Sequence, residues 1–86
     1  MSTVPFAELI ALRGMAANIG AAMEKAAFAW RERNDGKAMR WEIIAADLTY
    51  LLRNVARGTM KDEAITNEHR LIMDQWDTLN EEGAAQ

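Results

Sequence analysis

The first third of the chain carries few charges for a helix of its length. Between Phe6 and Trp30 the only charged side chains are Glu8, Arg13, Glu24 and Lys25. Apolar residues recur there at alternating spacings of three and four, which indicates an α-helix with the inner stripe Leu9, Leu12, Ala16, Ile19, Met23, Ala26 and Trp30. A helix with so little polar surface has to be covered by other helices, from this chain, a second copy or another protein. Association is therefore the leading expectation.

The length and composition predict one small helical domain. The chain has 86 residues, half of them hydrophobic, with a single Pro. This composition favours an all-α fold, and a domain of this size has only a marginal core, which favours oligomers. We expect a single domain over residues 1–86, folded as a small antiparallel three-helix bundle with a long first helix, and dimeric.

Turn and cap residues predict where the helices begin and end. Pro5 suits a first helical turn, and Gly36 is expected to end the first helix in the left-handed conformation. Asp35 is expected to cap the second helix, and Gly58 to stop it. The predicted helices cover about residues 5–33, 37–57 and 61–82.

The second predicted helix has two apolar stripes. One stripe is suited to the core and consists of Trp41, Ile44, Leu48, Leu51 and Val55. The other lies opposite and consists of Met39, Ile43, Ala46 and Tyr50. Two stripes imply two neighbours, either helices 1 and 3 of the same monomer or one of these and a partner. We favour the partner, and expect Met39, Ile43 and Tyr50 to bind it.

The predicted helices differ in length. At 1.5 Å per residue the first is about 43 Å long and the second about 30 Å, so about two turns of the first lack cover. The 58–64 connection, a kink at Gly14 or Gly20, or a second copy could supply the cover. We expect self-association through Phe6, Leu9 and Ile10.

The third predicted helix is acidic on its outer face. Residues 41–86 hold four Lys or Arg against nine Asp or Glu, and the outer strip contains Asp74, Asp77 and Glu81. Such strips usually serve only as solvated surface. As a functional site, the strip would dock on a basic surface of a protein partner and speed association. We therefore expect Asp74, Asp77 and Glu81 to contribute to partner binding.

The chain lacks the residue patterns of common catalytic sites. It has no Cys, its one Ser is Ser2, and it contains no phosphate-binding loop, nucleophile elbow or His-Glu-x-x-His motif. His69 falls in register with apolar residues of the third helix, where a partly buried, hydrogen-bonded histidine is expected. We expect no enzyme activity, no metal and no cofactor. The absence of Cys and of an apolar stretch of about 18 residues predicts a cytoplasmic protein without membrane contact.

One segment resembles a known family. Residues 42–52, followed by Ala-Arg-Gly at 56–58, resemble the second helix of the all-helical MazG-like and phosphoribosyl-ATP pyrophosphohydrolases. That family holds magnesium with the acidic motifs E-E-x-x-E and E-x-x-D on successive helices. Glu24 and Asp47 match this pattern, whereas the other acidic positions hold Lys25, Phe28 and Ile44. The resemblance implies, as the alternative function, a degenerate nucleotide-binding helical protein with an incomplete metal site.

Basic and aromatic residues surround the first predicted turn. The basic residues are Arg31, Arg33, Lys37 and Arg40, diluted by Glu32 and Asp35. The acidic second half would repel a phosphate backbone, so nucleic-acid binding is not favoured. Trp30 and Trp41 flank the turn and are expected to pack on each other.

The features together favour an interaction protein. Surplus apolar surface without catalytic residues is typical of small regulatory or inhibitory proteins, such as phage or mobile-element inhibitors and bacterial adaptors. We therefore expect a non-enzymatic protein–protein interaction module that uses an apolar helix face and the acidic third helix.

Overall fold

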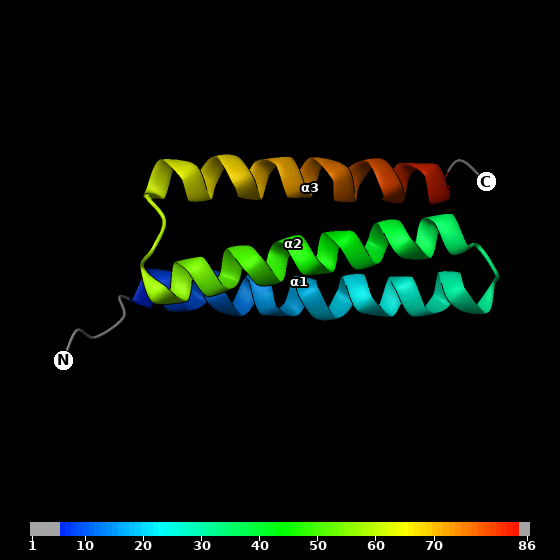
Figure 1. The fold of residues 1–86 in the computed structure, drawn as a ribbon, viewed down its shortest axis with the longest axis horizontal. Helices are drawn as coiled ribbons and strands as arrows, with labels where there is room; N and C mark the ends of the chain where they lie inside the picture. The colour runs from blue at the N-terminus through cyan, green and yellow to red at the C-terminus, as the bar shows by residue number, and fades with distance from the viewer. Residues whose placement is uncertain (1–5, 85–86) are drawn as a thin grey trace.

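The computed structural model describes the backbone of residues 6–84 and the side chains of residues 8–82. The chain forms helices α1 (Phe6–Arg31), α2 (Asp35–Arg57) and α3 (Asp62–Ala84). It reverses direction at each connection, so the helices lie side by side in a rod (Figure 1). The predicted all-α fold with three helices is confirmed for these residues.

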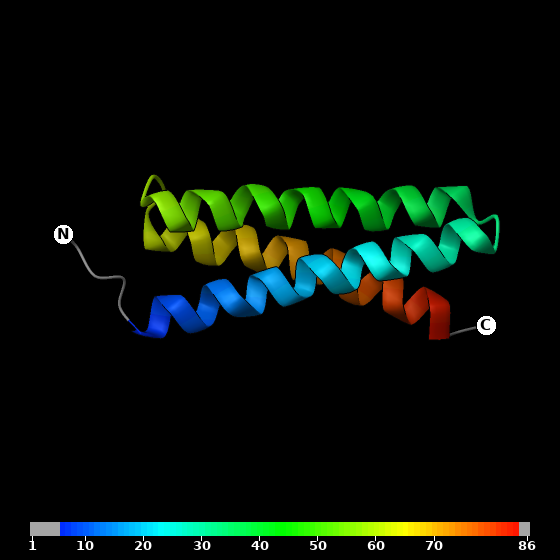
Figure 2. The ribbon, with the colours of Figure 1, turned by 90° about the horizontal axis from the view of Figure 1, so that it is seen from below.

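Helix α2 is the central element of the fold. It packs against both α1 and α3, whereas no Cα atom of α1 comes within 8 Å of one in α3. Figure 2, seen from below, shows α1 and α3 on the same side of α2. Both neighbours therefore pack on the core side of α2, and the second predicted stripe, Met39, Ile43, Ala46 and Tyr50, is exposed in this chain.

The seam between α1 and α2 is built from small side chains. Ala22, Ala26 and Ala29 of α1 are buried, and so are Ala38 and Ala45 of α2. Alanines at a helix contact allow the two axes to approach closely. The hairpin of α1 and α2 is therefore the tighter of the two helix pairs.

The seam between α2 and α3 is built from large side chains. Trp41 of α2 meets Trp76 of α3 edge to face, with ring centroids 5.1 Å apart and an interplanar angle of 84°. The core around this pair also contains Ile44, Leu48, Leu51, Ile72 and Leu79. Large residues at a helix contact hold the axes further apart, so grooves open beside this seam.

The inner stripe of α1 differs from the predicted one. Ala26 is the only residue of that stripe that is buried; Leu12 and Ile19 are half-buried, and the exposed members are Leu9, Ala16, Met23 and Trp30. The buried residues are instead Met15, Ala22, Ala26 and Ala29. A helix that is apolar on most sides has weak periodicity, and here the alanine side is turned inward because it allows the closest approach to α2.

The first turn also differs from the prediction. Helix α1 ends at Arg31 rather than near residue 33, and Arg33 takes the positive φ of 60° that was expected at Gly36. Asn34, not Asp35, caps α2, because its side-chain oxygen accepts from the backbone N–H of Lys37 at 3.3 Å. Gly36 lies inside α2.

A shorter α1 and an earlier start of α2 together remove most of the predicted length mismatch. Helix α1 has 26 residues and α2 has 23, so their lengths differ by less than one turn. The prediction for Gly58 is confirmed, since it ends α2 with a φ of 68° and donates its N–H to the carbonyl of Val55 at 3.2 Å. Helix α3 begins at Asp62, one residue after its predicted start, and ends at Ala84, two residues beyond its predicted end.

The predicted contact between Trp30 and Trp41 is wrong. Trp30 lies at the edge of the α1–α2 seam, 41 % exposed, and donates from Nε1 to Oε1 of Glu42 at 2.9 Å. Trp41 is buried, with Trp76 on one side and Nζ of Lys25 5.3 Å from a ring centroid. The alanine contact leaves no space for two indole rings between α1 and α2.

Candidate interaction surface

Large apolar side chains remain exposed on all three helices. Those on α1 are Leu9, Ile10, Met23, Phe28 and Trp30. Those on α2 are Met39, Ile43 and Tyr50, and α3 adds Leu71. Single exposed apolar residues are common, so the informative question is which of them gather in one hollow.

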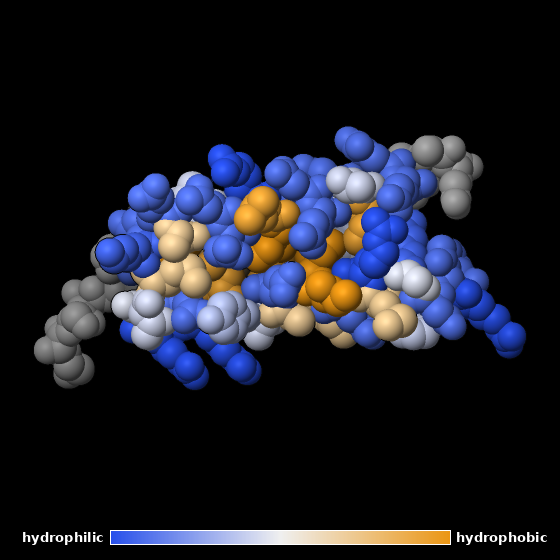
Figure 3. Space-filling model, turned by 45° about the horizontal axis from the view of Figure 1, so that its top comes forward, coloured by the Kyte–Doolittle hydropathy of each residue, from blue (hydrophilic) through white to orange (hydrophobic). Residues whose placement is uncertain are grey.

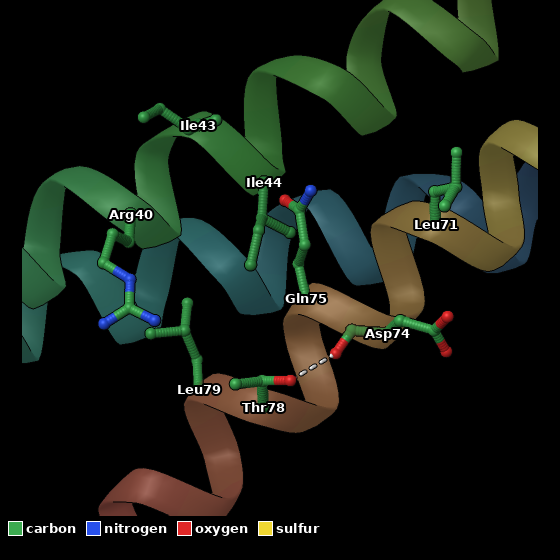
Figure 4. Close-up of a pocket in the computed structure, with 8 residues that line it drawn as sticks. All are labelled: Arg40, Ile43, Ile44, Leu71, Asp74, Gln75, Thr78 and Leu79. Atoms are coloured by element: carbon green, nitrogen blue, oxygen red, sulfur yellow. Dashed lines mark hydrogen bonds between the residues drawn. The ribbon is translucent and has the colours of Figure 1, made fainter.

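A groove between α2 and α3 brings two of them together. Its volume is about 410 Å³, and it is lined by Arg40, Ile43, Ile44, Leu71, Asp74, Gln75, Thr78 and Leu79 (Figure 4). Ile44 and Leu79 are only 1 % exposed and form the floor. Ile43 and Leu71 are more than half exposed at its two walls. Figure 3 shows apolar surface in the middle of the face that contains this groove, bordered by hydrophilic residues.

A smaller pocket continues the groove toward the α2–α3 connection. It has a volume of about 130 Å³ and is lined by Asp47, Tyr50, Leu51, Met60, Glu68 and Ile72. Leu51 and Ile72 are buried beneath it, and Tyr50 is 67 % exposed. Ile72 follows Leu71 directly on α3, and Asp47 follows Ile44 by three residues, about one helical turn, on α2. The two hollows therefore lie along the same α2–α3 seam. We refer to both together as the α2–α3 groove.

The charged groups of the α2–α3 groove are mostly acidic. Its lining contains the carboxylates of Asp47, Glu68 and Asp74 and one cation, Arg40. Arg40 pairs with Glu82 through two hydrogen bonds of 3.0 and 3.2 Å. None of the three carboxylates takes part in a salt bridge among residues 8–82. The groove is therefore an apolar hollow with a net negative border.

The structure places the predicted partner-binding residues in two groups. Ile43 and Asp74 line the larger hollow, and Tyr50 lines the adjoining pocket. Met39, Asp77 and Glu81 are exposed but line neither. Their role in partner binding stays a prediction.

Sequence reasoning missed Leu71. The signal was an apolar doublet, since Leu71-Ile72 on α3 repeats the pattern of Ile43-Ile44 on α2. In both doublets the second residue is buried and the first is exposed at the groove wall. Such a doublet indicates that the apolar face of the helix is wider than the part that packs in the core.

A second groove lies between α1 and α3. It has a volume of about 630 Å³ and is lined by Ala11, Gly14, Met15, Asn18, Ile65, Thr66, His69, Arg70 and Met73. His69 is half-buried there, and its side chain makes no hydrogen bond among the described residues, contrary to expectation. Of the predicted self-association residues, Leu9 and Ile10 are 37 % and 53 % exposed, and the Phe6 side chain lies outside the described part.

Further observations concern the other functions considered. Within residues 8–82 no three His, Cys, Asp or Glu side chains are grouped as a metal site, and this includes Glu24 and Asp47. Comparison with known proteins matches this chain to no family, no curated protein and no solved structure. No helix in the described part combines the length and apolar character needed to cross a membrane.

Proposed function

We propose that this chain is a non-enzymatic protein–protein interaction module that regulates or inhibits a larger protein. Phage and mobile-element inhibitors and bacterial adaptors are examples of this class. The observation that carries the proposal is the α2–α3 groove, where exposed Ile43, Tyr50 and Leu71 surround a buried apolar floor. The proposed partner presents a basic surface, because the border of the groove is acidic.

The energetics of the groove support protein binding. Covering apolar surface favours a complex, but only the gain that exceeds the lost freedom of the two molecules and their side chains appears as affinity, so the quality of a few central residues decides it. Tyr50 is of the residue type most enriched among binding hot spots, and its ring stands beside the pocket over Leu51 and Ile72. Met39, Asp77 and Glu81 would add contacts at the edges of a large partner.

Self-association is a separate part of the proposal. We infer a homodimer in a cytoplasmic setting, with Phe6, Leu9 and Ile10 at the contact between copies. This region and the α2–α3 groove lie on different helices, so a dimer could bind its partner. Light scattering on the purified chain measures this part directly: twice the chain mass supports it, and the mass of one chain contradicts it.

Partner binding is tested with the double variant Ile43→Asp, Tyr50→Asp. Both side chains are more than half exposed, so two carboxylates should leave helicity and melting temperature almost unchanged. The immobilised chain should retain a specific protein from extracts of its native cell. The double variant should lose that protein, because each new charge would be desolvated at the contact.

A matched control keeps the test specific. The variant Ala17→Asp, Ala27→Asp places two carboxylates on exposed, uncharged positions of α1, away from the α2–α3 groove, and should retain the protein. Circular dichroism checks that both variants are folded. Equal retention by the wild-type chain and the groove variant would contradict the proposed function, as would the absence of any protein retained by the wild-type chain.

A further inference from the structure

We propose that the α2–α3 groove binds one amphipathic α-helix of a partner protein, with Lys or Arg residues along both edges of its apolar face. This inference rests on the proposed function and deepens it, since it names the chemistry of the bound segment. It follows from the shape of the groove, from the position of its charges and from the repulsion expected if two copies of the chain met through this groove.

The shape of the groove suits a helix. Its lining runs from Arg40 to Leu51 on α2 and from Glu68 to Leu79 on α3. Each of these stretches rises about 16 Å, which is three helical turns. A helix in such a hollow presents apolar residues at positions i, i+4 and i+7 to the floor. It would pack on α2 and α3 in the way that helices pack in a bundle.

The charges of the groove select the flanks of that helix. Asp47 stands on the α2 wall, and Glu68 and Asp74 stand on the α3 wall. A bound helix would therefore have carboxylates on both sides, beside its own flanking residues. Lys or Arg there would gain opposite charges at both edges, whereas Asp or Glu would be repelled. Arg40 adds little positive charge because Glu82 already pairs with it.

A second copy of this chain is disfavoured as the occupant. Symmetric pairing places the same surface on both sides of the interface, so the carboxylates of one copy would border those of the other. The only cation in the lining, Arg40, is already paired within its own chain. Insertion of a different face of a second copy would be a head-to-tail contact, which continues into a ring or a filament and does not give the proposed dimer.

Two synthetic peptides test the inference directly. Both have about 14 residues, which spans the groove with a turn to spare, and share one apolar stripe of Leu. One carries Lys and Arg beside the stripe, and the other carries Glu at the same positions. NMR titration of the isotope-labelled chain measures affinity and location. The basic peptide should bind about tenfold more tightly at low salt, with the largest shifts at Ile43, Tyr50 and Leu71.

Three variants assign the binding to the groove. Ile43→Ser should weaken binding of the basic peptide about tenfold or more, because the apolar wall is lost and no charge is added. Asp47→Asn with Asp74→Asn should remove most of the preference for the basic peptide. The matched double variant Glu8→Gln, Glu24→Gln removes two exposed charges from α1, outside the groove lining, and should preserve that preference.

Several outcomes would overturn the inference. Equal binding of both peptides, or a preference that survives Asp47→Asn with Asp74→Asn, would exclude the basic helix while leaving the proposed function to its own retention experiment. Binding of the basic peptide that Ile43→Ser does not weaken would show only surface electrostatics. A dimer mass that Ile43→Ser reduces to that of one chain would assign the groove to a second copy. Failure of both peptides to bind would also reject the inference.

Discussion

Arg33 holds an unusual backbone conformation in the α1–α2 turn. Its φ of 60° is the only positive φ of a non-glycine residue in the described part of the chain. Such a residue costs roughly 1–2 kcal/mol because Cβ approaches the following carbonyl oxygen. Asn34 follows directly as the N-cap of α2, with a φ of −93°, so the positive φ falls on Arg33.

We predict that Arg33→Gly stabilises the fold. Glycine has no Cβ, so the substitution removes the steric cost of the positive φ. The greater backbone entropy of glycine in the unfolded state offsets part of this, and the free energy of unfolding should rise by about 0.5–1 kcal/mol. Thermal unfolding should show a rise in Tm of about 2 to 6 °C. Arg31→Gly, at the last residue of α1, should lower Tm instead. A lower Tm for Arg33→Gly would show that the arginine side chain stabilises the turn.

Helix α1 shows which part of the fold could be predicted. The presence of three helices and the stop at Gly58 followed from cap residues and spacing, because these are local properties of the chain. The inward face of α1 did not follow. Ala22, Ala26 and Ala29 are buried because α2 also offers alanines, Ala38 and Ala45, and a match between two helices cannot be read from one of them.

The candidate site was predicted in the same partial way. Ile43 and Tyr50 were identified because they lie opposite the core stripe of their own helix. The hollow itself depends on the separation of α2 from α3, which Trp41 and Trp76 set, and separation is a tertiary property. Asp74 was predicted for its charge, whereas Leu71 was missed because its apolar neighbour Ile72 fitted the core stripe.

Helix α1 contains Gly14 and Gly20, and at both positions this chain has space for a larger side chain. An added Cβ at Gly20 would meet no atom within 4 Å in this chain, and its φ is not positive. Gly20→Ala should therefore raise the free energy of unfolding by about 0.5–1 kcal/mol, as judged by denaturant titration. Gly58→Ala, at a φ of 68°, should lower it. Destabilisation by Gly20→Ala would indicate that a second chain approaches the backbone there.

At the scale of the whole molecule, the backbone of α3 lies close to that of α2 alone. No Cα atom of α3 comes within 8 Å of one in α1, whereas α1 and α2 share the closest seam of the fold. Contact between α3 and α1 is limited to side chains around the groove between them. The Arg40–Glu82 ion pair adds one further tie, but both side chains are half exposed, which limits its worth to about 1 kcal/mol or less. Helix α3 can thus separate from the hairpin without breaking the α1–α2 seam.

We predict that α3 exchanges its amide hydrogens faster than α1 and α2. Opening of α3 alone exposes less apolar surface than global unfolding, so it requires less free energy. Leu79→Ala, in the α3 core, should speed exchange in α3 by more than in the hairpin, since such a truncation costs about 2–5 kcal/mol. Hydrogen-exchange mass spectrometry resolves the three helices. Uniform exchange rates in all of them would contradict the prediction.

Because α3 packs mainly on α2, it has a further property at high protein concentration. A released α3 finds on any neighbouring molecule the same α2 surface that it has just left, so two molecules can exchange their third helices. The exchanged pair would rebuild every native contact and differ only around residues 58–61, which connect the helices. Such a pair would form slowly, persist after dilution and separate on mild heating, even if the native surfaces of the two molecules had no affinity for each other.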